Sequence, residues 1–212
     1  MGKLIIEGIN FSYEHDKLLD NVFFEMKNPG NFGLMGLNGA GKSTFFNCLS
    51  GYNNFETGLL KINDRIIKND KRWKHFSYLN QKNFLPFDMK VKQAIKLFSS
   101  SEIIDERIEE LRSIKIGKLS SGEKRYLENL IILGMNREFI ILDEPFSEIE
   151  PLYIAKLSKL IKEKSKEHGI IITDHNHHAV RSVCDEIGIL RNRRIIKIKN
   201  TDEELRLNGY YA

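Results

Sequence analysis

The sequence predicts an α/β fold in which helices cover both faces of a mostly parallel sheet. A short apolar run at residues 32–35 leads into a glycine-rich loop at residues 36–44, and a helical pattern then continues until Gly51. Two further apolar runs, at residues 139–142 and 170–173, are continuous rather than alternating, which is typical of strands buried on both faces. Helical segments separate these strands, and this alternation favours a parallel sheet.

The composition indicates one globular domain in a reducing compartment. The 212 residues are 41% hydrophobic and 29% charged, values typical of globular proteins, and a net charge of +4 is too small to indicate nucleic-acid binding by itself. Cys48 and Cys184 fit no metal-binding spacing. No signal segment opens the chain and no apolar run approaches the roughly 18 residues of a membrane helix, so we expect a cytoplasmic protein that reaches a membrane only through a partner.

The N-terminal part is expected to form an antiparallel β subdomain. Residues 4–6 and 22–26 have strand-like composition. Residues 59–67 have the pattern of a hairpin, with its turn at Asn63 and Asp64.

Two polar segments of this part contain aromatic residues. Tyr13 and His15 lie in the connection between the first two strands. The basic run at residues 68–75 includes Trp73 and is the best candidate for a nucleic-acid-binding patch. A solvated loop or hairpin end fits the same pattern, and we favour that interpretation.

The glycine-rich loop has the spacing of a phosphate-binding site. It comprises Gly36, Leu37, Asn38, Gly39, Ala40, Gly41, Lys42, Ser43 and Thr44. Its glycines let successive backbone N–H groups point into one concavity, where the positive end of the following helix helps to hold phosphate oxygens. Lys42 is then placed to reach the β- and γ-phosphates, and the Ser43 hydroxyl is placed to bind Mg²⁺.

A small helical insert is expected after a strand at residues 76–81, which ends on Gln81. Pro86 breaks the strand pattern, and helix-forming residues dominate from 83 to 118. The serine triplet at residues 99–101 separates two segments with apolar side chains at helical spacing. These side chains are Val91, Ala94, Ile95 and Phe98 in the first segment and Ile104, Ile108 and Leu111 in the second.

Residues 119–123 open the next helix, because Ser120 and Glu123 fit a capping box. The apolar residues expected on one face of this helix are Leu127, Leu130, Ile131 and Met135. With this helix included, we assign a helical subdomain to about residues 83–136 of a single domain spanning residues 1–212.

Polar residues follow both of the later buried strands at their carboxyl ends. Residues 139–142 lead into Asp143 and Glu144, and residues 170–173 are followed closely by His175. Ligands of α/β sheets bind at this edge. The two strand ends are therefore candidate parts of one site.

The remaining elements are short helices and a hairpin. In order, we expect a helix from Pro151 to His168, a helix at residues 179–183, a hairpin of residues 187–190 and 195–198 around Asn192 and Arg193, and a terminal helix opened by Thr201 and Glu204. His177 and His178 have no other ligand pattern nearby, so we interpret them as exposed residues at a helix start rather than as metal ligands.

The order of these motifs resembles the ATP-binding-cassette (ABC) ATPase, the nucleotide-binding subunit of ABC transporters, along the whole chain. Residues 36–44 resemble the Walker A motif, and residues 139–144 resemble Walker B with its adjoining glutamate. Gln81 falls at the position of the Q-loop, and residues 119–123 are similar to the signature motif. His175 resembles the switch histidine. A Walker A motif alone indicates only a P-loop nucleotide enzyme, whereas a signature between the Q-loop and Walker B is specific.

The resemblance implies ATP and Mg²⁺ as ligands and a role for each motif residue. Ser43 and Asp143 are expected to hold Mg²⁺, with Gln81 sensing both the metal and the attacking water. Glu144 is expected to polarise that water. His175 is expected to contact the γ-phosphate and keep the water and Glu144 in register. Tyr13 lies where the family stacks an aromatic ring on adenine.

The resemblance also implies a head-to-tail dimer of ATPase subunits, either identical or different. The signature residues Ser120, Ser121, Gly122 and Glu123 of one subunit then face the nucleotide held by the other. Separate transmembrane permease subunits are the expected partners, which places the protein on the inner face of the cell membrane. No nucleic acid is expected as a partner.

Two residues depart from the pattern that the ABC ATPase family has at their positions. Ser121 replaces the first of two signature glycines, and Glu150 replaces an aspartate. The helical insert is also short for the family.

The alternative functions are a soluble ABC ATPase that acts in nucleic-acid, ribosome or cofactor-assembly processes, and a regulatory nucleotide binder without catalysis. Every catalytic position is occupied, which disfavours the second.

Overall fold

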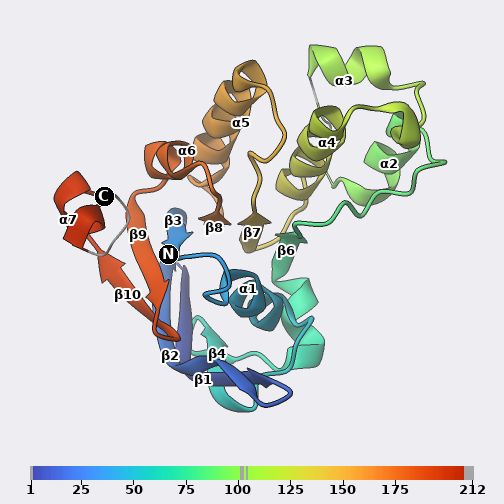
Figure 1. Cartoon of the computed structure of the whole chain (residues 1–212). Coiled ribbons are helices and arrows are strands. Elements are labelled where there is room, and N and C mark those ends of the chain that lie inside the picture. Colours follow the sequence, from blue (N-terminus) through green and yellow to red (C-terminus); the bar gives the residue numbers. More distant parts are fainter. Residues whose placement is uncertain (1, 101–102, 104, 208–212) are drawn as a thin grey trace.

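The computed structural model describes residues 2–100, 103 and 105–207, which form two sheets and the helices around them (Figure 1). The smaller sheet has the strand order β2-β1-β4-β5 and is antiparallel. Its strands are β1 (Gly2–Tyr13), β2 (Asp16–Asn28), β4 (Thr57–Ile62) and β5 (Arg65–Ile66). The predicted antiparallel β subdomain is confirmed, with a turn at Asn63 and Asp64, which both have positive φ.

The larger sheet has the strand order β10-β9-β3-β8-β7-β6. Every neighbouring pair in it is parallel except the edge hairpin of β9 and β10. Its strands are β3 (Gly30–Met35), β6 (Phe76–Leu79), β7 (Phe139–Asp143), β8 (Gly169–Thr173), β9 (Glu186–Arg191) and β10 (Arg194–Ile198). The predicted mostly parallel sheet is therefore confirmed.

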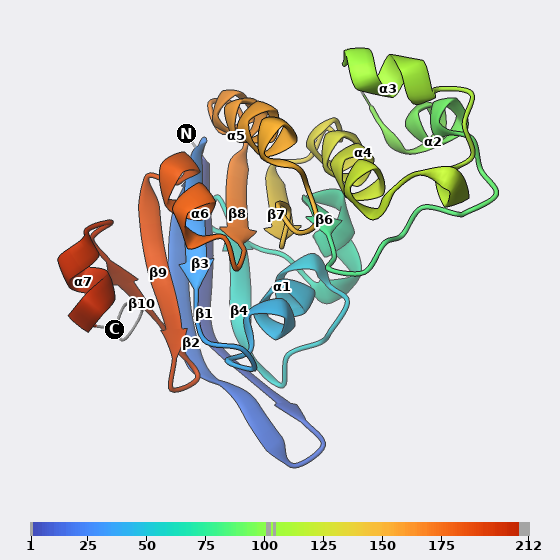
Figure 2. The same cartoon turned by 45° about the horizontal axis from the view of Figure 1, so that its top comes forward.

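Helices cover the two faces of this sheet, as Figure 2 shows. Helix α1 (Lys42–Ser50) packs between the two sheets, while α5 (Pro151–Lys164) and α6 (His177–Val183) cover the opposite face. Alternate residues of β7 enter different cores: Ile141 packs with the α1 side, and Ile140 and Leu142 pack with α5. This double burial explains the continuous apolar run in the sequence.

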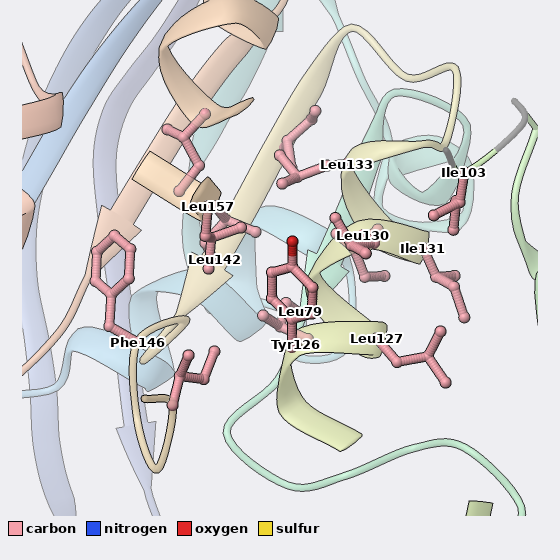
Figure 3. Close-up of a cluster of buried hydrophobic side chains, with 14 of the residues drawn as sticks. Leu79, Ile103, Tyr126, Leu127, Leu130, Ile131, Leu133, Leu142, Phe146 and Leu157 are labelled. Atoms are coloured by element: carbon pink, nitrogen blue, oxygen red, sulfur yellow. The ribbon is translucent and has the colours of Figure 1, made fainter. Parts of the chain in front are cut away.

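Three further helices lie together beyond β6. They are α2 (Val91–Phe98), α3 (Glu106–Leu111) and α4 (Ser121–Leu133), and Figure 3 shows the apolar side chains of α4 packed against β7, α5 and Leu79. Ser101 and Ile104, which the sequence assigned to this region, lie outside the described residues. Among the described helices, none is long and apolar enough to cross a membrane.

Several predicted helix limits are wrong. Helix α5 ends at Lys164 rather than His168, because Lys166 and Glu167 donate to carbonyls three residues back and tighten the last turn. Helix α4 ends at Leu133, so Met135 lies beyond it. The last nine residues of α4 are buried on all sides rather than on one face.

Smaller differences concern polar segments. The basic run forms a 3₁₀ helix, Asn69–Lys74, rather than a loop or hairpin end, and Arg72 within it is buried. Tyr13 is the last residue of β1. Helix α6 begins at His177, which is half-buried rather than exposed, whereas His178 is exposed. The described residues contain no cluster of three side chains that could hold a metal ion there.

The last helix of the described residues is α7 (Asp202–Leu207), where the Glu204 N–H donates to the Thr201 hydroxyl at 3.3 Å.

Candidate functional site

The glycine-rich loop joins β3 to α1 and leaves the start of that helix open. Gly41 caps α1 with a φ of 101°, a left-handed conformation that only glycine adopts without strain. Helix α1 has no acidic residue in its first turn, so no side chain of the helix itself offsets the positive end of its dipole. The loop is therefore suited to an anionic group.

The Lys42 ammonium group turns back onto this loop. Its Nζ donates to the carbonyl oxygens of Gly36 at 2.7 Å and Leu37 at 3.2 Å. Burial lowers the pKa of Lys42, whereas the carboxylates of Asp143 and Glu144 act in the opposite direction. Lys42 is thus a half-buried cation that faces the end of β7.

Asp143 is the last residue of β7 and is 1% exposed. Its carboxylate accepts a hydrogen bond from the Tyr78 hydroxyl at 3.3 Å, and the nearby Ser43 hydroxyl acts to lower its pKa. Burial is the main cause that raises the pKa of Asp143. A hydroxyl and a buried carboxylate therefore meet where the phosphate loop ends.

Glu144 follows directly and lies between two polar side chains. Its Oε2 accepts from Gln81 Nε2 at 3.1 Å, and its Oε1 lies 3.1 Å from His175 Nε2. Its backbone has a φ of 55°, which is rare for a residue with a side chain, and its N–H donates to Thr173 O at 2.7 Å. The turn after β7 thus places this carboxylate between the residues that follow the neighbouring strands β6 and β8.

These groups surround one cavity of about 500 Å³. It is lined by Leu18, Asn38, Gly39, Gly41, Lys42, Ser43, Thr44, Gln81, Asp143, Glu144 and His175. Residues from the ends of three parallel strands, β6, β7 and β8, and from the phosphate loop after β3 thus converge, as the sequence predicts. A larger groove of about 560 Å³ elsewhere is lined mainly by apolar residues of β1, β2 and β10 and lacks this convergence of polar groups.

Five residues differ from the prediction at this cavity, and three of them, Gly36, Leu37 and Ala40, belong to the phosphate loop but do not line the cavity. Tyr13 is 67% exposed and is not among the lining residues, so its stacking on adenine stays a prediction. Leu18 of β2 also lines the cavity, although no motif in the sequence includes it. Its carbonyl oxygen would lie 3.3 Å from a Cβ on Gly41, a tertiary approach with no local signal in the sequence.

The signature-like residues form the start of α4, and none of them lines the cavity of its own chain. The predicted capping box is confirmed: the Glu123 N–H donates to Ser120 Oγ at 3.2 Å, and Ser120 N donates to Glu123 Oε2 at 2.9 Å. Arg107 of α3 donates to Glu123 Oε1 at 2.6 Å. These contacts hold the N-terminus of α4, where the Ser120 hydroxyl lies.

Gly122 packs against the segment after β7. A Cβ added to Gly122 would lie 2.5 Å from the carbonyl oxygen of Glu148, closer than two such atoms can approach.

We therefore expect Gly122→Ala to lower the free energy of unfolding by roughly 1–3 kcal/mol, as in other overpacked sites. Thermal unfolding measures this change. Ser121→Gly is the control with an expected cost of at most about 1 kcal/mol, and equal melting temperatures for Gly122→Ala and the unaltered chain would contradict the packing argument.

Comparison with known proteins identifies the family. The family model described as ABC transporter matches residues 19–147, more than half of the chain. The chain belongs to the ABC transporter family. As a member, this ABC protein is an ATP-binding, ATP-hydrolysing subunit that powers a membrane transporter, and the predictions of fold, activity and ATP binding are confirmed.

Relatives and solved structures agree with this assignment. The methionine import ATP-binding protein MetN of Clostridioides difficile is 26% identical, over 93% of this ABC chain and 68% of the relative. The lipopolysaccharide export system ATP-binding protein LptB of Haemophilus influenzae is 28% identical, over 92% of the chain and 90% of the relative. Transporter proteins are thus the relatives found, rather than the soluble ABC ATPases considered as an alternative.

The fold of this ABC subunit matches solved ATP-binding cassettes. An ATP-binding subunit of an ABC transporter superimposes with a TM-score of 0.83 and 24% identity, over 98% of this chain and 93% of the other. A dimeric cassette in a post-hydrolysis state bound to ADP and Pi superimposes with a TM-score of 0.79 and 16% identity, over 93% and 99% of the two chains. At these identities the likeness concerns the fold alone.

Proposed function

We propose that this ABC subunit hydrolyses ATP in the 500 Å³ cavity, with Glu144 as the general base. The observation that carries this proposal is the placement of the Glu144 carboxylate, 3.1 Å from both the Gln81 amide and the His175 imidazole. A carboxylate held in this way can accept a proton from water as the water attacks the γ-phosphate. Gln81 and His175 then fix the direction in which the carboxylate points.

Lys42 and the phosphate loop bind the triphosphate in this proposal. The loop residues from Gly36 to Thr44 offer backbone N–H groups, and Lys42 exchanges its bonds to two loop carbonyls for β- and γ-phosphate oxygens. Negative charge on the phosphates also favours the protonated form of Lys42, which opposes the effect of burial on its pKa.

The residues at the end of β7 fit a Mg²⁺ ion. Ser43 and Asp143 already meet there, and the buried Asp143 carboxylate has its pKa raised by burial, so a cation beside it stabilises the ionised form. Ser43, Asp143 and Gln81 would hold the ion. When bound, it neutralises charge on the phosphate oxygens.

The signature residues are proposed to complete the cavity of a second subunit. Ser120, Ser121, Gly122 and Glu123 do not line the cavity of their own chain and sit at the N-terminus of α4, a position that favours anions. Two ABC subunits packed head to tail, identical or different, bring this end to the partner's γ-phosphate. Glu150, which caps α5 without a side-chain hydrogen bond, lies in the segment proposed to cross that interface.

The rest of the assembly is proposed by analogy with the relatives. The chain is taken as one ABC domain with a helical subdomain at about residues 83–136, held by permease subunits at the inner face of the membrane. MetN is named for import and LptB for export, so the direction of transport does not follow from them.

The dimer proposal predicts how activity depends on protein concentration. If each cavity needs the signature of another subunit, the hydrolysis rate per subunit rises with concentration until dimers predominate. Phosphate release measured over a dilution series with saturating ATP and Mg²⁺ checks this. A constant rate per subunit in a protein that light scattering shows to be monomeric would contradict the shared site.

A further inference from the structure

Arg125 of α4 is a buried cation that no proposed step of hydrolysis uses. It is 4% exposed, and its guanidinium lies behind the catalytic turn rather than in the cavity. Buried charges need partners, and the hydrogen bonds that the Arg125 guanidinium donates go to main-chain carbonyl groups. These partners belong to the two segments that carry Glu144 and Gln81.

The first set of contacts holds the turn after β7. Arg125 Nε and one terminal nitrogen donate to Glu144 O at 3.1 and 3.0 Å, and the same terminal nitrogen donates to Asp143 O. On the other side, the Glu144 N–H donates to Thr173 O. The left-handed backbone of Glu144 is therefore fixed at both ends, as a conformation of this kind requires.

The second set holds the segment around Gln81. The other terminal nitrogen of Arg125 donates to Asn80 O at 2.7 Å, one residue before Gln81. One turn along α4, the fully buried Glu128 accepts from Phe84 N at 2.8 Å and Leu85 N at 3.3 Å. Glu128 also lies 3.6 Å from Arg125, so the two charges compensate each other.

We infer that Arg125 is a positioning residue, which ties the signature helix α4 to both the general base Glu144 and Gln81. Its planar fork reaches Asn80 O, Asp143 O and Glu144 O together, so α4, the turn after β7 and the end of β6 move as one unit. Contact between the start of α4 and a partner subunit is then transmitted to the catalytic carboxylate. This inference rests on the proposed roles of Glu144 and Gln81.

The test compares Arg125→Lys and Arg125→Gln in the full chain. Lysine keeps the charge but cannot reach all three carbonyl groups, and glutamine loses the charge as well. We expect kcat for ATP hydrolysis to fall about 10- to 100-fold in Arg125→Gln and less in Arg125→Lys. The dissociation constant for ATP should stay near that of the unaltered protein, because the phosphate loop is intact.

The controls separate positioning from folding and from the proposed site itself. Arg65→Lys and Arg65→Gln alter an exposed arginine of β5 and should leave both constants unchanged. All rates are measured well below each variant's melting temperature, and if Arg125→Gln does not fold, Arg125→Lys decides. A folded variant with unchanged kcat, or with kcat and ATP affinity reduced together, overturns the inference. Normal hydrolysis by Glu144→Gln would instead overturn the proposed function, and the inference with it.

Discussion

Glu144→Gln is expected to reduce ATP hydrolysis by about 10²- to 10⁴-fold while ATP binding persists. The amide keeps the size of the side chain and an acceptor for Gln81, but it cannot take a proton from water. Loss of a negative charge near the phosphates also removes a repulsion, so the bound nucleotide is held at least as firmly. Because hydrolysis is what ends the ATP state, the variant should accumulate as an ATP-bound dimer.

Two measurements check this result. Phosphate release reports the rate, and light scattering after gel filtration with ATP reports the dimer. Glu163→Gln, an exposed glutamate on α5, is the matched control and should behave as the unaltered protein. Residual turnover close to the control would exclude Glu144 as the base.

Lys42→Met is expected to weaken ATP binding about 10- to 100-fold, since a hydrogen bond between charged groups is worth roughly 1.5–3 kcal/mol. Methionine preserves the length of the side chain without its ammonium group. The variant therefore loses the cation for the phosphates and the two bonds to the loop carbonyls of Gly36 and Leu37. Hydrolysis should fail through lack of binding, in contrast to Glu144→Gln.

Equilibrium binding of ATP, followed by calorimetry, measures the change. Lys162→Met removes an exposed lysine from α5 and is the control for charge. ATP affinity equal to the control would show that the loop binds phosphate without its lysine. A fall in affinity accompanied by unfolding would be visible in the melting temperature of the same samples.

The sequence allowed the strands and most of the site to be predicted, because these depend on local patterns. The continuous apolar runs of β7 and β8 end directly at polar residues, so Asp143, Glu144 and His175 could be selected without knowledge of their neighbours. The glycine spacing likewise allowed the phosphate-binding loop around Lys42 to be predicted from the local sequence alone. The contacts of Glu144 with Gln81 and His175 follow once the strands are ordered.

Arg125 and Glu128 could not be predicted, because on a helix they resemble residues of a solvated face. The expectation was that α4 is apolar on one side, yet its last nine residues are buried all round. This happens because α4 packs against β6, β7, α5 and α2, and Figure 3 shows its side chains beside Leu142 of β7 and Leu157 of α5. The limit of α5 was missed because its last turn tightens through the hydrogen bonds of Lys166 and Glu167 to carbonyls three residues back, which no residue pattern marks.

The strand order of the larger sheet determines the width of the site, because the strands, rather than the loops, set the distances between its residues. Ser43, His175, Glu144 and Gln81 follow β3, β8, β7 and β6, which are consecutive neighbours, so the site is three strand spacings wide, or about 14 Å at roughly 4.8 Å each. The helical segment that joins β6 to β7 does not alter the distance between the strands, but its Arg125 holds the turn after β7 and the residue before Gln81. A change in the length of this crossover would therefore leave the strand spacing intact, provided that the contacts of Arg125 with Asn80 O and Glu144 O are kept.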